Sequence, residues 1–168
     1  MPSEELDRFI ESWGSMGILW GINRSMARIQ ALLMTAEEPL DAETISSRLN
    51  ISRGNASMCL KELRSWGVVQ RVHQSGDRRD FYQLEPDIWT MIYRIARERK
   101  AREFDPAFHA LRHLMAETDT EGSEAVHQRL TQLEEILSKV DRVMGRVLKN
   151  ETMSKTMLDF VGSSFLKD

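Results

Sequence analysis

The sequence predicts a mainly α-helical protein with one two-stranded β-hairpin. Apolar residues recur at helical spacing over most of the 168 residues, whereas β-branched and aromatic residues cluster only in 68–73 and 81–84. The chain is 41% hydrophobic and 29% charged, which excludes a mainly disordered protein. A chain of this length can form a core without metal or disulfide support.

Composition also bears on compartment and cofactors. Cys59 is the single cysteine, so an intrachain disulfide and a multi-cysteine zinc site are excluded. The longest apolar run, 18–22, is too short for a bilayer, and the first residues are acidic, unlike a secretory signal. We therefore expect a cytoplasmic protein with no membrane partner, no cofactor and no metal.

The first half of the chain predicts four helices and the hairpin. Apolar spacing indicates helices over 4–13 and about 18–35, separated by Gly14 and Gly17. Asp41 and Ser52 are expected to cap two further helices, 42–49 and 53–66, and Gly67 to end the second. The hairpin strands follow, joined by a polar loop over 74–79.

After Pro86 the pattern is helical again, with helices expected from Asp87 and, after a charged run at 97–102, from Pro106. The last long helix carries a heptad pattern over Val126, Leu130, Leu133, Leu137, Val140, Met144 and Val147. We expect this helix to dimerise the protein together with the N-terminal helices. In the alternative, it folds back on 18–33 of the same chain.

Two helices joined by a short turn, then a hairpin with a basic tip, is the order of a winged helix-turn-helix. Its second helix enters the major groove with a small, polar N-terminal face, and its wing reaches the minor groove. The candidate DNA contacts are Ser52, Arg53, Gly54, Asn55, Ser57, Lys61, Arg71, Arg78 and Arg79. Asp77 would be repelled by phosphate, so we expect it to hold a neighbouring arginine in place.

We therefore expect three regions: N-terminal helices at 1–35, a DNA-binding region at 36–86 and a helical dimerisation or effector region at 87–168. The net charge is −3, yet six basic and three acidic residues give 52–84 a charge of +3. A local basic patch, and not the overall sign, attracts phosphate.

Residues 45–84 resemble the DNA-binding core of the MarR superfamily, whose wing carries an Asp-x-Arg signature, here Asp77-Arg78-Arg79. The segments 9–14 and 65–69 are similar more specifically to the GbsR branch. The resemblance implies a homodimeric transcriptional regulator, in some members of the branch one that senses choline-type compatible solutes.

Three further groups have a functional and a structural interpretation. Cys59 is either a redox sensor or, as we expect, inert packing; His109 and His113 are either metal ligands or, as we expect, a solvated pair. Four aromatic residues could form a box that binds a quaternary ammonium effector, but we favour packing in the core. They are Trp13, Trp20, Trp89 and Tyr93.

The leading hypothesis is a DNA-binding repressor or activator that acts as a homodimer. The alternative is a winged-helix module that docks protein and lacks the steep salt dependence of DNA binding. The sequence shows no nucleophile–base pair, glycine-rich phosphate loop or carboxylate constellation, so we do not expect an enzyme.

Overall fold

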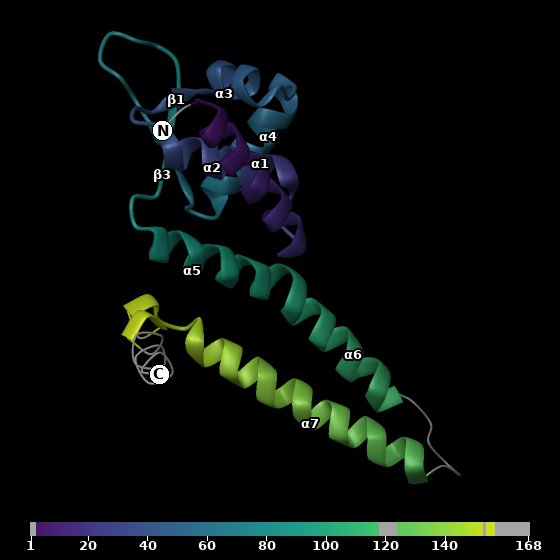
Figure 1. Ribbon diagram of the computed structural model, residues 1–168. Coiled ribbons are helices and arrows are strands. Elements are labelled where there is room, and N and C mark those ends of the chain that lie inside the picture. Colours follow the sequence, from purple (N-terminus) through teal and green to yellow (C-terminus); the bar gives the residue numbers. More distant parts are fainter. Residues whose placement is uncertain (1–2, 118–123, 153, 157–168) are drawn as a thin grey trace, which may run out of the picture. The chain divides into compact units, whose positions relative to one another are not determined.

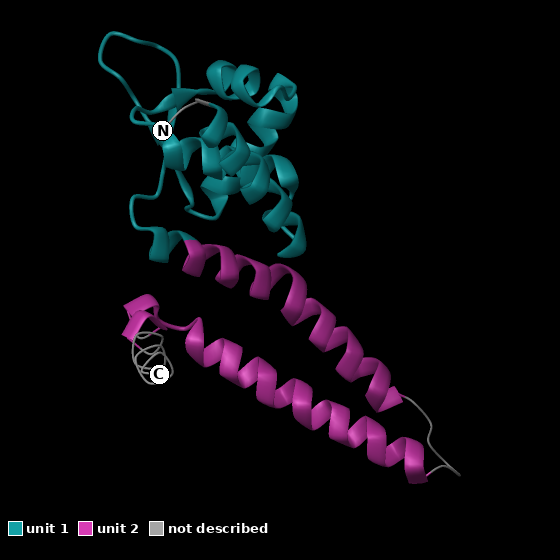
Figure 2. Cartoon of the chain, viewed as in Figure 1, with its two compact units in different colours: residues 1–91 teal, residues 92–168 magenta. Residues whose placement is uncertain are grey.

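The computed structural model describes residues 3–117, 124–152 and 154–156 (Figure 1). The chain divides into two compact units, residues 1–91 and 92–168 (Figure 2). Helices dominate both units, and the strands form one small sheet in the first. The predicted fold class, a mainly helical winged helix, is confirmed.

Unit 1 is built around helix α2, Arg24–Thr35. Helix α1, Ser3–Leu19, helix α3, Ala42–Leu49, and helix α4, Arg53–Ser65, all contact α2. Ala27, Ile29 and Ala31 of α2 have no exposed surface, because neighbours cover this helix on several sides. The core therefore fixes the position of α4, the helix expected to contact DNA.

The sheet has three antiparallel strands in the order β1–β3–β2, one more than the hairpin that the sequence predicts. Strands β2, Val69–Val72, and β3, Phe81–Leu84, form the wing, with Val72 paired to Phe81. Strand β1, Leu40–Asp41, pairs with Tyr82 and Phe81 on the other edge of β3. Two residues carry no strand periodicity, so only the long-range pairing reveals β1.

The predicted boundary between the first two helices is wrong. Helix α1 continues through both glycines to Leu19, and α2 begins only after Asn23, whose side chain accepts hydrogen bonds from the amides of Ser25 and Met26. A Cβ atom on Gly17 would lie 2.5 Å from Ala27 Cβ, and one on Gly14 would lie 2.6 Å from Arg28 Cγ. The two glycines therefore let α1 approach α2 closely and do not break the helix.

The predicted caps of the helix-turn-helix are confirmed. Asp41 Oδ1 accepts a hydrogen bond from the Thr44 amide at 2.7 Å, and Ser52 Oγ accepts one from the Asn55 amide at 3.1 Å. The turn between α3 and α4 contains Asn50 in the left-handed region, and Gly67, at a φ of 73°, follows α4. Local chemistry thus sets both ends of the two helices.

Helix α5, Ile88–Arg99, crosses the boundary between the units and continues into a π-helix, Lys100–Phe104, and helix α6, Asp105–Glu117. The sequence predicts a break here and a new start at Pro106. In an α-helix the proline ring would clash with the carbonyl of Arg102. Since Arg102 lies in the wider π-helical turn, we attribute the continuity of the helix to that turn.

Helix α7, Glu124–Val147, contacts α6 and runs back along it within unit 2 (Figure 1). Tyr93 of α5 donates a hydrogen bond from its hydroxyl to the Leu148 carbonyl at 2.8 Å, just beyond the end of α7. Among the described residues, no helix is long and apolar enough to cross a membrane.

Candidate nucleic-acid interface

The N-terminal turn of α4 is the centre of the candidate interface. Ser52 caps it, and the expected contacts Arg53, Gly54, Ser57 and Lys61 are all exposed. The first turn of α4 holds no acidic residue, so no carboxylate in this turn competes for its free amides or for the positive end of the helix dipole. This end of α4 is suited to a phosphate or a base edge.

Arg53 pairs with a carboxylate that the sequence analysis did not identify. Its Nη2 donates to Glu43 Oε1 on α3, and the two side chains are 77% and 68% exposed. An ion pair this exposed contributes little to stability, so Arg53 can exchange it for another acceptor at low cost. Glu43 lies ten residues from Arg53, and the helix-turn-helix brings the two together.

Asn55 differs from the expectation of an exposed polar face. It is half-buried, and its Nδ2 donates to Ser25 Oγ on α2 at 3.0 Å. Its Oδ1 accepts from Cys59 Sγ at 3.3 Å. Asn55 therefore joins α4 to α2 in this structure.

In the wing, Asp77 holds Arg79, as the sequence predicts. Arg79 Nη2 donates to Asp77 Oδ2 at 2.6 Å, Nε donates to the same oxygen at 3.0 Å, and the Arg79 amide donates to Oδ1 at 2.9 Å. These hydrogen bonds from Arg79 hold the pKa of Asp77 below its usual value. Arg79 also lies over the Phe81 ring, 5.1 Å from its centroid.

Arg79 also reaches α3. Its Nη1 donates to Asp41 Oδ2, and Asp41 is 5% exposed. The Thr44 amide, first, and Arg79 lower the pKa of Asp41, although burial acts against them. Asp41 thus caps α3, pairs within the sheet and binds Arg79. It therefore connects the wing to the helix-turn-helix.

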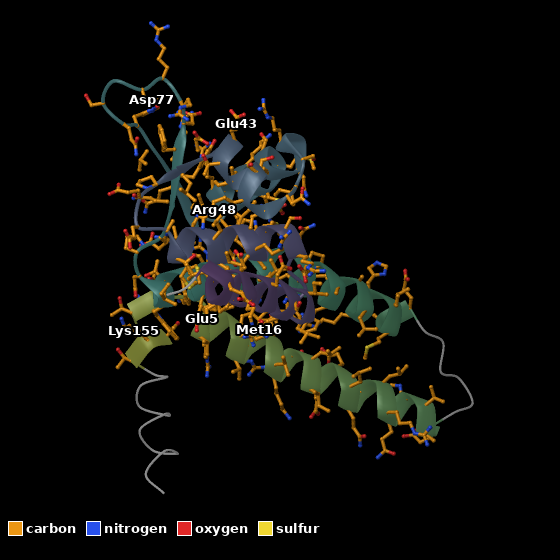
Figure 3. The ribbon with its side chains drawn as sticks, turned by 45° about the horizontal axis from the view of Figure 1, so that its top comes forward. Glu5, Met16, Glu43, Arg48, Asp77 and Lys155 are labelled. Carbon is orange, nitrogen blue, oxygen red and sulfur yellow. The ribbon has the colours of Figure 1, made fainter. Side chains whose placement is uncertain are left out.

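Arg71 and Arg78 complete the expected wing contacts. Arg71 Nη1 donates to Asp80 Oδ2 at 3.1 Å. Arg78 is exposed at the wing tip and has no ion pair with any residue that the structure describes. Asp77, next to Arg78 in the chain, lies at the same end of unit 1 as Glu43 (Figure 3). The wing tip and the start of α3 and α4 therefore form one face.

The basic character of this face is weaker than the sequence suggests. Arg53, Arg71 and Arg79 each pair with a carboxylate. Over 41–84, seven basic residues (Arg48 and the six noted above) meet five acidic ones, which leaves +2. Two of these acidic residues, Asp41 and Glu43, precede the segment 52–84, whose own charge is +3.

The four aromatic residues of the suggested effector box have different surroundings. Trp13 and Trp20 contact each other edge to face, with centroids 6.1 Å apart, and Trp13 Nε1 donates to Gln30 Oε1 at 3.4 Å. Tyr93 is buried and bonded to Leu148, as described above. Trp89 is half-buried on α5, and within the described part of the chain its ring contacts none of the other three.

Cys59 is buried, and burial raises the pKa of its thiol, which agrees with inert packing. His113 Nδ1 lies 3.1 Å from Glu117 Oε2, and His109 is exposed. Within the described part of the chain, no group of three or more His, Cys, Asp or Glu residues is placed to hold a metal ion.

The seven heptad positions of α7 divide between two faces. Leu130, Leu137 and Met144 are half-buried, as is Val147 at the end of the helix. Val126, Leu133 and Val140 are exposed, at 41%, 39% and 42%. The structure contains a single copy of the chain, so the predicted dimer contact stays a prediction.

Comparison with known proteins gives the following matches. Residues 20–80 match a family model described as the MarR family. A curated relative from Bacillus subtilis, named as the HTH-type transcriptional regulator YvaV, is 22% identical over 83 residues, 49% of this chain and 47% of the relative. The match thus spans about half of each protein.

Among solved structures, one described as a transcriptional regulator has a TM-score of 0.59 at 22% identity and covers 89% of this chain and 99% of its own. A mutant of S. aureus MepR bound to an oligodeoxyribonucleotide has a TM-score of 0.41 at 18% identity, with 80% and 91% covered. The first of these structures shares the fold along nearly the whole of its length.

Proposed function

We propose that this chain, whose residues 20–80 match the MarR family model, is a transcriptional regulator and not an enzyme. It binds a specific double-stranded DNA site as a homodimer. The observation that carries this proposal is one face that joins the capped, exposed start of α4, with Arg53, to a wing tip with the unpaired Arg78.

In this function, α4 reads the major groove. Arg53 leaves Glu43 and donates its two parallel N–H groups to guanine O6 and N7, the commonest specific contact of arginine. Ser57 and Lys61 lie one and two turns further along α4 and bind phosphate oxygens. Asn55 acts indirectly, because its bonds to Ser25 and Cys59 set the position of α4 on α2.

The wing arginines have different roles. Arg78 enters the minor groove, whose narrow form attracts an arginine side chain. Arg79 binds Asp77 and Asp41 and holds the wing in position relative to the start of α3. Loss of Arg79 therefore weakens binding evenly across sequences.

A homodimer brings two such faces to half-sites about one helical turn apart. Two half-sites supply the specificity that one helix and one wing lack. We propose that the dimer acts as a repressor by occupying its operator, and that it belongs to the GbsR branch because 9–14 and 65–69 resemble that branch. A choline-type effector is the ligand that this branch implies, with Trp13 and Trp20 as its first candidate contacts.

Binding to the DNA upstream of the gene for this chain tests the proposal. Affinity for that duplex and for an unrelated duplex is measured by gel shift at two salt concentrations. We expect specific binding that weakens steeply with salt, because DNA releases counterions when phosphates are neutralised. Arg53→Ala should cost about 1–3 kcal/mol on the specific duplex and less on the unrelated one.

Arg64→Ala is the matched control, because Arg64 is exposed and its substitution removes the same charge from the other end of α4. It should leave the ratio of the two affinities unchanged. Equal effects of both substitutions would show that α4 reads no bases. Absence of salt-dependent binding to any duplex would instead favour the protein-docking module.

A further inference from the structure

Helix α7 carries an apolar face that stays exposed beside the described residues of α6. Leu133, Ile136, Val140 and Val143 are 39%, 57%, 42% and 57% exposed. Their spacing of three, four and three residues places them on one stripe along about 15 Å of helix. We call these four residues the outer seam.

The outer seam is distinct from the face of α7 that lies against α6. Leu130, Leu137 and Met144 are half-buried, and Leu130 lines a groove with Met115 of α6. Asp141, on the same side, accepts a hydrogen bond from Lys100 Nζ at 2.9 Å and lies 3.5 Å from Arg112 Nη2. Contacts within the hairpin therefore occupy one side of α7, and among the residues that the structure describes none covers the outer seam.

The α6–α7 hairpin has no fully buried residue among those that the structure describes. Two helices in contact bury at most one stripe each, so burial of a second stripe requires a third helix. A coiled-coil type of spacing is self-complementary, because each side chain fits between those of an identical helix. A second copy of α7 meets this requirement without any other partner.

Charge determines the direction of the second copy. Residues 124–135 carry three glutamates and one arginine, a net charge of −2, whereas 139–147 carry Lys139, Arg142 and Arg146 against Asp141, a net charge of +2. A parallel pair would place acidic half beside acidic half and basic beside basic. An antiparallel pair places each acidic half beside a basic one.

From this geometry and charge we infer that two copies of the chain pair through antiparallel outer seams. The two-fold axis passes between Ile136 and Val140, so that Leu133 of one copy lies opposite Val143 of the other. This inference rests on the homodimer of the proposed function. It replaces the single heptad stripe with an outer seam for the second copy and an inner face for α6.

Disulfide cross-linking tests both the face and the direction. The chain is first made cysteine-free with Cys59→Ala, and then Leu133→Cys and Val143→Cys are made separately. The two variants carry tags of different length, and each is oxidised alone and after co-expression. The two positions are ten residues apart, about 15 Å along the helix, whereas a disulfide needs Cα atoms within about 7 Å.

The antiparallel seam predicts that the co-expressed pair forms a mixed disulfide and that neither variant cross-links alone. Cross-linking of Leu133→Cys to itself would show a parallel pair and overturn the inference. A dimer in sedimentation that forms no disulfide would overturn the seam and leave the proposed homodimer intact. A monomer of 19.4 kDa at micromolar concentration would overturn both.

A pair of charge substitutions gives an independent measurement. Ile136→Glu with Val143→Glu should raise the dissociation constant of the dimer by about tenfold or more, because it places four carboxylates in an apolar seam. The control, Gln128→Glu with Thr131→Glu, adds the same charge at exposed positions outside the seam and should change the constant far less. Equal effects of the two pairs would contradict the seam, provided that circular dichroism shows both variants to be equally helical.

Discussion

Arg53 and Arg71 each have a carboxylate partner in the DNA-free protein, Glu43 and Asp80. Binding to phosphate or to a base requires that such a pair opens, and both pairs are exposed enough for this to cost little. In the proposed complex the carboxylates nevertheless remain beside the DNA. They oppose binding to any sequence and leave specificity to contacts that only the correct bases provide.

Glu43→Gln tests this role of the carboxylate. The substitution removes a negative charge beside the DNA, so affinity for an unrelated duplex should rise, by about threefold at low salt. Arg53 also loses the charge of the partner that holds it, so the ratio of specific to unrelated affinity should fall. Fluorescence anisotropy with both duplexes measures these changes. Glu37→Gln, at an exposed position in the loop before β1, is the control.

Asp41 makes the stability of the wing depend on pH. Its pKa in the folded protein lies below the ordinary value of 3.8, chiefly because the Thr44 amide donates to it and with help from Arg79. A lowered pKa means that this stabilisation is complete above the unfolded pKa and is lost as the pH falls through the folded one.

Asp41→Asn isolates the charge, since asparagine caps a helix about as well as aspartate. The variant should have a lower free energy of unfolding than the parent at pH 7. The difference in free energy of unfolding should shrink as the pH falls below 4, where Asp41 of the parent becomes protonated. Urea unfolding across this range measures it. A difference that stays constant into acid would show that the charge of Asp41 contributes nothing.

At the scale of elements, the close contact of α1 with α2 depends on Gly17. Gly17→Ala gains helix propensity, about 1 kcal/mol, but places a Cβ atom 2.5 Å from Ala27 Cβ, and such overpacking costs about 1–3 kcal/mol. We expect a net loss of stability in urea unfolding. Gly145→Ala on α7 has no atom within 4 Å of the new Cβ, so it should stabilise by about 0.5–1 kcal/mol. Stabilisation by both would show that α1 does not pack closely on α2.

The elements that the sequence predicts well are those whose signals are local. Asp41 and Ser52 bind amides three residues ahead, and Asp77 binds Arg79 two residues ahead, so spacing alone reveals them. The continuation of α1 through its two glycines depends on packing against α2, and strand β1 depends on pairing with β3, so their local patterns are misleading or too short. The start of α2, in contrast, has a local signal in the Asn23 cap that the predicted boundary missed. The inward position of Asn55 depends likewise on Ser25, 30 residues away.

At the scale of the whole molecule, we propose that unit 1 supplies one DNA-reading face and that unit 2 joins it to a second copy. Each part needs the other, because a single face carries few unpaired basic residues and a net charge over 41–84 of only +2. Two faces on one duplex double the number of phosphate contacts and impose a fixed distance between half-sites.

Selection of DNA from a pool of random duplexes by the full-length protein tests this claim most directly. We expect enrichment of a sequence with two-fold symmetry, with half-sites about 10 base pairs apart from centre to centre. Arg53→Ala should lose the enrichment at a guanine in each half-site, whereas Arg64→Ala should retain it. Enrichment of a single asymmetric site, or of no sequence at all, would contradict a sequence-specific homodimer.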